Sequence, residues 1–241
     1  MFIVCVAAVD EIRYLKKRLD LKSKKVISGT VFYTGLLGGR ELLLVHTGVG
    51  PRRARAAAKK IVALYAPERV LVIGAAGGID PGLQVGDIVC AQSVIAGQGH
   101  EYPADREWLQ HAQAVLGRCG YAILSGRALA VKGFVHSWRD KKELHDRSGC
   151  QVVDMESGAL ARVFAEAGIS WCTIRIVSDS AHADTVNFEL LLKERRRAPL
   201  LGIMRYVLRC PSEALKLLKL KMGLRRAGRL IRDIVTALAN E

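Results

Sequence analysis

The sequence predicts an α/β fold in which a mostly parallel sheet carries helices on both faces. Its apolar, β-branched segments are continuous runs without polar alternation, which is typical of strands buried on both sides. These runs alternate along the chain with segments of helical periodicity, which is typical of parallel strands joined by crossover helices. We find no internal repeat and no low-complexity linker that would divide the fold.

The predicted strands follow from the apolar runs. They cover residues 2–8, 41–47, 69–73, 151–154 and 171–177, and residues 87–95 are predicted to be extended. Glycine-rich segments at 48–51 and 74–78 follow the second and third strands and are expected to be loops. The predicted helices cover residues 10–19, 52–65, 106–116, 141–147 and 156–167.

Length and composition are those of an ordinary globular protein. The chain has 241 residues, 50% hydrophobic and 25% charged, and can bury a core without disulfides. No apolar run approaches the ~20 residues that a bilayer-spanning helix needs. Residues 1–9 are apolar but meet Asp10 and Glu11 at once, so they predict a buried first strand rather than a secretory signal.

The spacing of cysteines and histidines predicts neither disulfides nor a metal site. The six cysteines lack CxxC spacing and several lie in apolar runs, so we expect reduced, buried thiols in a cytoplasmic protein. The six histidines show no HExxH-type pairing, so we expect no metal. We expect no other cofactor. The glycine-rich segments alone are weak evidence of a site, because residues 74–78 do not form a clean GxGxxG turn before a helix.

Three carboxylates follow the predicted strands. Glu11 comes after the first strand, Glu156 after the short strand and Asp179 after the last. Ligands of such sheets bind beyond the carboxyl ends of the strands, so these side chains are expected to converge beside the two glycine-rich segments. Each carboxylate alone could be an ordinary helix-start or capping residue. Their combination favours a functional site.

Four motifs follow one another over residues 1–190. They are HTGVGP (46–51), VIGAAGGIDPGLQVGDIV (72–89), VVDMES (152–157) and IRIVSDSA (174–181). In order and spacing they resemble the nucleoside phosphorylase/nucleosidase superfamily, which contains purine nucleoside phosphorylases and methylthioadenosine/S-adenosylhomocysteine nucleosidases. The resemblance implies a three-layer α/β/α sandwich with a mixed, mostly parallel central sheet, and cleavage of an N-glycosidic bond.

The resemblance also implies two catalytic residues. Asp179 matches the aspartate that protonates the purine N7 as the base leaves, and Glu11 matches the glutamate that activates water in the nucleosidases. A leaving purine anion needs a proton, and a positioned acid or base is worth ~10²–10⁴ in rate. We expect burial beside other carboxylates to keep Asp179 protonated near neutral pH.

The substrate-binding residues are implied in the same way. Glu156 matches the glutamate that binds the ribose hydroxyls, and Met155 the methionine under the sugar. Phe134 and Val135 fall near the segment that contacts the base, although Lys132 stands where the family often has an acid. The implied set is completed by the strand-end residues Ser178, Gly77, Ala76 and Gly48.

Water is predicted as the nucleophile in place of phosphate. Val72 and Ala75 stand where the phosphorylases of this superfamily place an arginine and a serine or threonine, and the N-terminal phosphate-binding Gly-Asp-Pro-x-Arg segment is absent. Phosphate needs charge-assisted donors, and these are missing. Arg52 and Arg53 keep phosphorolysis open, although they are also ordinary solvated residues of a helix start.

Positive charge is concentrated at the C-terminal end. The net charge is +14, and residues 193–241 hold thirteen of the 37 basic but only four of the 23 acidic residues. We therefore divide the chain into a nucleoside phosphorylase-like catalytic domain, residues 1–192, and a basic amphipathic helical extension, residues 193–241. Helical patterns in the extension cover residues 200–209, 212–222 and 224–238.

The last helical pattern is amphipathic. One apolar stripe consists of Leu224, Ala227, Ile231, Ile234 and Leu238, with arginines on the opposite side. Two interpretations stay open: the stripe docks on the core or on a second subunit, or it lies on an anionic membrane. Nucleic acid is not expected as a partner, because few aromatics accompany the charge and no RNA-binding motif is present.

The basic tail, together with residues 140–144 and 149–157, resembles the hopanoid-associated phosphorylase/nucleosidase subgroup. That resemblance implies release of adenine from adenosylhopane, a lipid-anchored nucleoside, by a cytoplasmic protein at the inner face of the membrane. Methylthioadenosine/S-adenosylhomocysteine nucleosidase and futalosine hydrolase are alternatives, and a basic membrane- or nucleic-acid-binding module is the non-enzyme alternative. A homo-oligomer is expected, because in related enzymes a neighbouring subunit completes part of the pocket.

Overall fold

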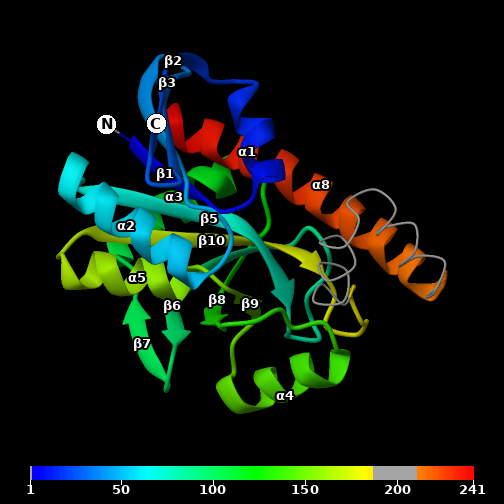
Figure 1. Cartoon of the computed structure of the whole chain (residues 1–241). Coiled ribbons are helices and arrows are strands. Elements are labelled where there is room, and N and C mark those ends of the chain that lie inside the picture. Colours follow the sequence, from blue (N-terminus) through cyan, green and yellow to red (C-terminus); the bar gives the residue numbers. More distant parts are fainter. Residues whose placement is uncertain (1, 187–210) are drawn as a thin grey trace.

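The fold is built on a ten-stranded sheet in a computed structural model that describes residues 2–186 and 211–241 (Figure 1). Its strands are β1 (Phe2–Val6), β2 (Asp20–Ile27), β3 (Thr30–Leu37), β4 (Arg40–His46), β5 (Arg69–Gly78), β6 (Ile88–Ala96), β7 (His100–Pro103), β8 (Ile123–Ala130), β9 (Val152–Asp154) and β10 (Ser170–Asp179). Its helices are α1 (Val9–Lys16), α2 (Pro51–Tyr65), α3 (Arg106–Arg118), α4 (Trp138–Ser148), α5 (Ser157–Glu166) and α8 (Pro211–Ala239).

The sheet is mixed, as the resemblance implied. Parallel pairing joins β4 to β1, β1 to β5 and β5 to β10, so the carboxyl ends of these four strands lie at one edge. Antiparallel pairing joins β10 to β6, β5 to β9, and β2 to β3 to β4. The parallel centre is the part of the sheet that places ligand-binding residues together.

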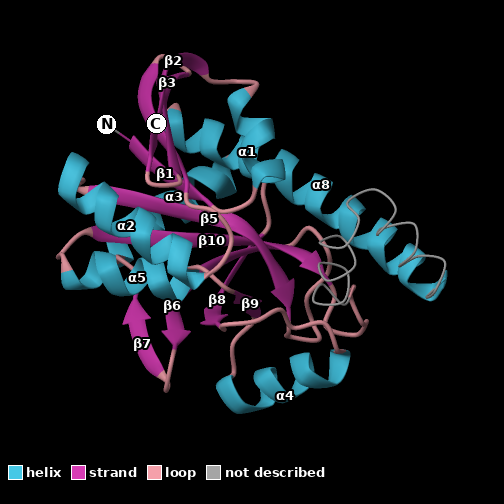
Figure 2. Ribbon diagram, viewed as in Figure 1, coloured by secondary structure: helices cyan, strands magenta, loops and turns pink. Residues whose placement is uncertain are grey.

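Helices cover both faces of the sheet, so the predicted three-layer α/β/α fold is confirmed (Figure 2). Successive residues of β1 point to opposite faces, as in any strand. Val4 belongs to a core with Leu15 of α1 and residues of α3 and α8. Ile3 belongs to a second core with Ala58 of α2 and Phe164 of α5.

Four strands that the structure contains were not predicted: β2, β3, β7 and β8. In β2 most side chains are exposed because the strand ends the sheet, so its sequence DLKSKKVI is mostly polar. In β8 half-buried and exposed residues interrupt the apolar pattern. An apolar-run criterion finds only strands that are buried on both faces.

The prediction of a glycine-rich loop at residues 74–78 is wrong, because β5 continues to Gly78 and pairs with β10 and β9. These glycines do not turn the chain. They let side chains of neighbouring strands pack close to the backbone of β5. A Cβ atom on Gly78 would lie 3.0 Å from Val177 Cγ1, and one on Gly77 would lie 3.3 Å from Val153 Cγ1. The small residues therefore allow close packing between strands. A glycine-rich sequence pattern alone does not distinguish such a strand from a loop.

The two predicted helices over residues 212–222 and 224–238 form one helix, α8. Gly223, which stands between the two predicted ranges, lies against the backbone oxygen of Ser178, where a side chain has no room. The predicted helix over residues 200–209 lies outside the described residues.

The apolar stripe of α8 docks on the core, which decides between its two interpretations. Ala227, Ile231, Ile234 and Leu238 are buried against α1, α3 and the sheet. The stripe is therefore not available to a membrane, and the C-terminal half of α8 shares the core of the α/β domain. The division of the chain at residue 192 stays a prediction.

Four cysteines are free and buried as expected, namely Cys5, Cys90, Cys150 and Cys172. Cys119 is exposed at the end of α3, against the expectation, because it follows the last residue of that helix. Cys210 lies outside the described residues. In the part of the chain that the structure describes, every helix is too short or too polar to cross a bilayer.

Candidate functional site

Residues 75–77 near the end of β5 form the floor of the candidate site. The Ala75 N–H donates to Glu11 Oε1 at 2.7 Å, and the Ala76 carbonyl accepts from Ser178 Oγ at 3.1 Å. A Cβ atom on Gly77 would lie 3.4 Å from Asp179 Oδ2. Three consecutive residues of one strand thus contact α1, β10 and the carboxylate that ends β10.

Glu11 is held in one orientation by two backbone donors. It lies in the first turn of α1, where Oε2 accepts from the Ala8 N–H at 3.0 Å while Oε1 accepts from Ala75. The carboxyl is only 4% exposed, and burial raises its pKa although both N–H groups and Arg175 act in the opposite direction. A Cβ atom on Gly74 would lie 2.8 Å from Arg175 Nη1 and 3.4 Å from Glu11 Oε1, so the space beside Glu11 requires glycine.

A buried ion pair lies under the site. Arg175 Nε is 3.1 Å from Asp154 Oδ2, and both side chains are 2% exposed. Asp154 Oδ1 also accepts from the N–H groups of Glu156 and Ser157 at 2.7 Å each, which fixes the start of α5. Arg175 Nη2 finds no hydrogen-bond acceptor among the described residues, so this guanidinium keeps a donor for a ligand or a water.

Arg175 and Asp154 were not predicted as site residues, although a signal existed. A charged residue in the middle of the apolar strand WCTIRIV must be paired, because burial of an isolated charge is costly. Asp154 ends the short predicted strand that precedes WCTIRIV in the chain, and it is the partner of Arg175.

Glu156 joins the glycine-rich segment after β4 to the start of α5. Its Oε1 accepts from the Gly50 N–H at 2.6 Å. Burial and the neighbouring charge of Asp154 raise the pKa of Glu156 to about 7, and the charge of Glu11 acts in the same direction. Gly48 and Gly50 have φ angles of 78° and 100°, which only glycine adopts without strain. Met155 is half-buried beside Glu156.

Among the described residues Asp179 pairs with Lys141 and Ser178 and not with another carboxylate, so the expectation about its surroundings is not met. Its Oδ2 is 2.5 Å from Lys141 Nζ, and its Oδ1 accepts from Ser178 Oγ at 2.6 Å. The difference arises because α4, which belongs to a distant part of the sequence, brings a buried ammonium group to the end of β10. Lys141 has no sequence signal, because it stands in the polar run RDKKELHDR.

Phe134 and Val135 lie in the segment before α4, close to the chain that follows Asp179. The His136 carbonyl accepts from the Thr185 N–H at 2.8 Å, and the Trp138 N–H donates to Asp184 Oδ1 at 3.0 Å. Phe134 is 41% exposed, whereas Val135 is half-buried in a small cluster with Ile79 and Cys150. The structure thus places the segment that follows the predicted base-contacting residues against the chain that follows the predicted acid.

The residues at the phosphate positions offer no cationic donor to a phosphate. Val72 is buried in β5, and the backbone N–H of Ala75 is already used by Glu11. Arg52 and Arg53 are exposed in the first turn of α2. Within the described residues, no three His, Cys, Asp or Glu side chains cluster as a metal site would require.

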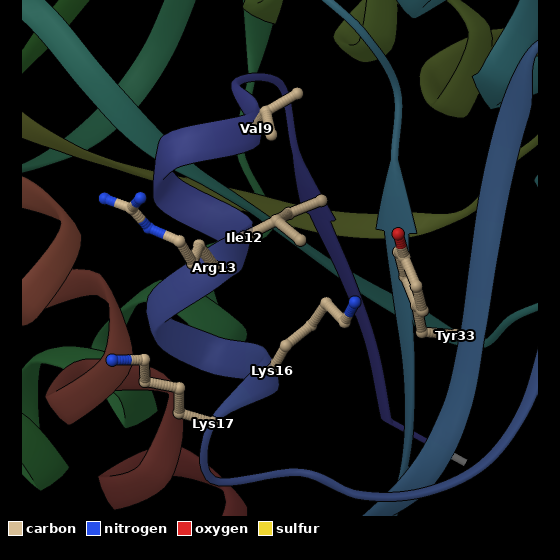
Figure 3. Close-up of a pocket in the computed structure, with 6 residues that line it drawn as sticks. All are labelled: Val9, Ile12, Arg13, Lys16, Lys17 and Tyr33. Atoms are coloured by element: carbon tan, nitrogen blue, oxygen red, sulfur yellow. The ribbon is translucent and has the colours of Figure 1, made fainter.

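A separate cleft of about 400 Å³ lies on the other side of α1 (Figure 3). It is lined by Val9, Ile12, Arg13, Lys16, Lys17 and Tyr33. Lys16 points toward Tyr33, with its Nζ 4.7 Å from the ring centre. Glu11 does not line this cleft, so the short helix α1 presents the carboxylate to one side and a cationic, partly apolar surface to the other.

Comparison with known proteins decides the family. A family model described as "Phosphorylase superfamily" matches residues 2–199. The chain belongs to this superfamily. The predicted superfamily is therefore confirmed. The match does not show membership of the hopanoid-associated subgroup.

Relatives within the superfamily are nucleosidases. The chain is 28% identical over 197 residues to the 5′-methylthioadenosine/S-adenosylhomocysteine nucleosidase of Halalkalibacterium halodurans, which covers 74% of this chain and 85% of the relative. It is 26% identical over 231 residues to the enzyme of the same name from Mycobacterium tuberculosis, and this match covers 80% of this chain and 90% of the relative.

Solved structures of the superfamily share the whole fold. Futalosine hydrolase of Helicobacter pylori superimposes with a TM-score of 0.79 at 16% identity, over 98% of this chain and 96% of that chain. The Neisseria meningitidis 5′-methylthioadenosine/S-adenosylhomocysteine nucleosidase in complex with methylthio-immucillin-A gives 0.79 at 21% identity, over 99% and 98%. At these identities the likeness concerns the fold.

Proposed function

We propose that the chain is an N-glycosidase that releases the purine base, adenine in the first place, from a nucleoside modified at the 5′ position. One observation carries the proposal: Glu11, Glu156 and Asp179 are each anchored by donors at the carboxyl ends of the parallel strands. Nucleosidases among its relatives support the reaction class.

Asp179 is the proposed acid. The electron pair of the glycosidic bond passes to the purine, and the Asp179 O–H bond breaks as an N7–H bond forms. Glu156 accepts hydrogen bonds from the ribose hydroxyls and faces the positive charge that develops on the sugar. Met155 supports the sugar, and Phe134 and Val135 contact the base. The remaining contacts come from the backbone at Gly48, Ala76 and Gly77 and from Ser178.

Water is the proposed nucleophile, with Glu11 as its base. Glu11 is buried near the Arg175 guanidinium, whose Nη1 lies with Glu11 Oε1 around the Cβ position of Gly74, and a carboxylate and a guanidinium together can orient one water molecule. The proton that leaves the water passes to Glu11, and the oxygen bonds to the anomeric carbon. The absence of a cationic donor at Val72 and Ala75 favours this step over attack by phosphate.

A base-release assay tests the proposal. Methylthioadenosine, S-adenosylhomocysteine and futalosine would each be supplied with and without phosphate, and the sugar product would be identified. We expect release of the base and a free sugar in both conditions for at least one nucleoside. A sugar 1-phosphate formed only with phosphate would contradict the water mechanism. A lack of release from these three nucleosides and also from a lipid-anchored nucleoside such as adenosylhopane would contradict the activity.

A lipid-anchored nucleoside such as adenosylhopane is the second candidate substrate. Two surface features favour it: Leu215, Leu218 and Met222 are more than half exposed on the first part of α8, and the cleft beside α1 combines cationic with apolar side chains. Both features suit a protein that works in the cytoplasm at the inner face of an anionic membrane. Adenine release from adenosylhopane in vesicles, compared with methylthioadenosine in solution, tests this substrate.

We also propose a homo-oligomer in which a second copy completes the pocket for the 5′ substituent. Light scattering at assay concentrations tests it, and an active monomer would contradict it.

A further inference from the structure

Lys141 is the buried residue of α4. Its side chain is 0% exposed, whereas the neighbouring Lys142 side chain is 65% exposed and forms a surface pair with Asp146. Lysine is almost never fully buried unless it is paired, because removal of an ammonium group from water is costly. The position of Lys141 therefore requires compensation from the residues around it.

Three acceptors supply that compensation. Lys141 Nζ is 2.5 Å from Asp179 Oδ2, 2.7 Å from the Ser180 carbonyl and 3.5 Å from the Ala183 carbonyl. An ammonium group has three donors, so each N–H has one oxygen. These three oxygens hold the Lys141 ammonium group against the carboxylate of the proposed acid, Asp179.

The same contacts fix the walls of the base site. Lys141 holds Asp179 Oδ2 while Ser178 donates to Oδ1, so both carboxyl oxygens have a protein donor. Because Lys141 lies on α4, these bonds also tie Asp179 and the chain after it to the segment that carries Phe134.

We propose that Lys141 is a positioning residue of the glycosidase reaction, which rests on the function proposed above. In the proposed reaction the carboxyl of Asp179 passes a proton to the departing base. Lys141 keeps its three protons throughout, holds the carboxyl in the direction of the base and offsets the negative charge that Asp179 acquires when its proton leaves.

The proposal predicts an effect that depends on the leaving group. A purine needs the proton from Asp179, whereas 4-nitrophenolate leaves without one. Lys141→Met should lower kcat for the purine nucleoside at least tenfold, given the ~10²–10⁴ that a positioned acid supplies. It should change kcat for the 4-nitrophenyl riboside by about twofold or less. Lys142→Met is the matched control and should leave both rates unchanged.

Equal losses on the two substrates, or no loss on the purine nucleoside, would overturn the proposal. A wild-type chain that releases no purine base would instead contradict the proposed function itself, so the two failures are distinguishable. Lys141→Arg, which keeps the charge, should retain more purine activity than Lys141→Met.

A double-mutant cycle decides the matter by itself, even if Lys141→Met folds poorly. Asp179→Asn combined with Lys141→Met removes both members of the buried pair, which is tolerated better than loss of one. If Lys141 acts through Asp179, the double variant should release the purine base at the same rate as Asp179→Asn, within about twofold. A further tenfold loss in the double variant would contradict the proposal.

Discussion

Glu156 shows how one residue couples the proposed chemistry to stability. Burial and the nearby charge of Asp154 raise its pKa to about 7, so the folded protein keeps the proton that the unfolded chain has released. Between about pH 4.5 and pH 7 the native state therefore binds more protons, and the free energy of unfolding falls as the pH rises. The proposed role of Glu156, to accept hydrogen bonds from the sugar hydroxyls and face positive charge, calls for the ionised carboxylate. The pH range in which Glu156 can act is therefore the range in which the free energy of unfolding is lower.

Glu156→Gln should remove that pH dependence. Glutamine keeps an acceptor for the Gly50 N–H but carries no charge. The variant should be more stable than wild type at pH 8, similar at pH 4, and severely impaired in base release at both. Urea unfolding at the two pH values, together with the adenine-release assay, checks this. A variant that unfolds with the pH profile of wild type would show that Glu156 does not carry the effect.

Asp179→Asn should lower base release by about a hundredfold or more, because the proposed acid is lost. It should also destabilise the fold, because Lys141 keeps a buried charge with one carboxylate fewer. Loss of one member of a buried pair typically costs about 3–5 kcal/mol, and the 11% exposure of Asp179 reduces that figure. Chemical denaturation and the base-release rate check the two parts. Full activity in a folded variant would exclude Asp179 as the acid.

Strand β5 shows that pairing with neighbouring strands decides the structure of a segment whose own sequence is ambiguous. Its first part, residues 69–73, is an ordinary buried strand that the apolar pattern predicts. Its second part, residues 74–78, carries three glycines in five residues, which predicted a loop, yet the strand continues because β10 pairs with it as far as Gly77. The pattern could not separate the two, since glycine permits both a turn and close packing between side chains.

Gly74→Ala should test the packing role of that segment. The new methyl group would lie 2.8 Å from Arg175 Nη1, so the buried guanidinium must move, while it would only touch Glu11 Oε1 at 3.4 Å. We expect a loss of about 1–3 kcal/mol in the free energy of unfolding and a marked loss of base release. Gly117→Ala is the matched control, because that glycine lies in α3 with nothing near its Cβ position and should gain about 0.5–1 kcal/mol. A neutral Gly74→Ala would contradict the packing argument.

At the scale of the whole molecule, the sequence predicts the sheet centre and the three carboxylates but not the pairings that hold the site. Strand-end positions of Glu11, Glu156 and Asp179 follow from local patterns and the topology rule. Lys141 and the Gly223 contact with Ser178 join segments that are distant in sequence, so no local pattern contains them. The same limit applies to α8, whose amphipathic pattern fits a core and a membrane surface equally well.

The two halves of α8 should respond differently to substitution. The C-terminal half buries Ile231 and Ile234 in the core. The first half of the helix projects beyond the sheet in Figure 1 and leaves Leu215, Leu218 and Met222 exposed. Ile231→Ala should cost about 2–5 kcal/mol and lower every activity through unfolding. Replacement of the three exposed residues by glutamine should leave the melting temperature within a degree or two.

Vesicle binding then separates a surface role from a structural one. If the first half of α8 lies on an anionic membrane, the triple glutamine variant should lose co-sedimentation with anionic vesicles and slow the turnover of a lipid-anchored nucleoside, while turnover of methylthioadenosine is unchanged. Lys219 and Lys221 remain in that variant, so residual binding should fall with salt, as electrostatic attraction does. Removal of residues 211–241 cannot make this distinction, because it also removes the buried stripe. A triple variant that binds vesicles as wild type does would exclude this face of α8 as the membrane surface and favour the small soluble nucleosides as substrates.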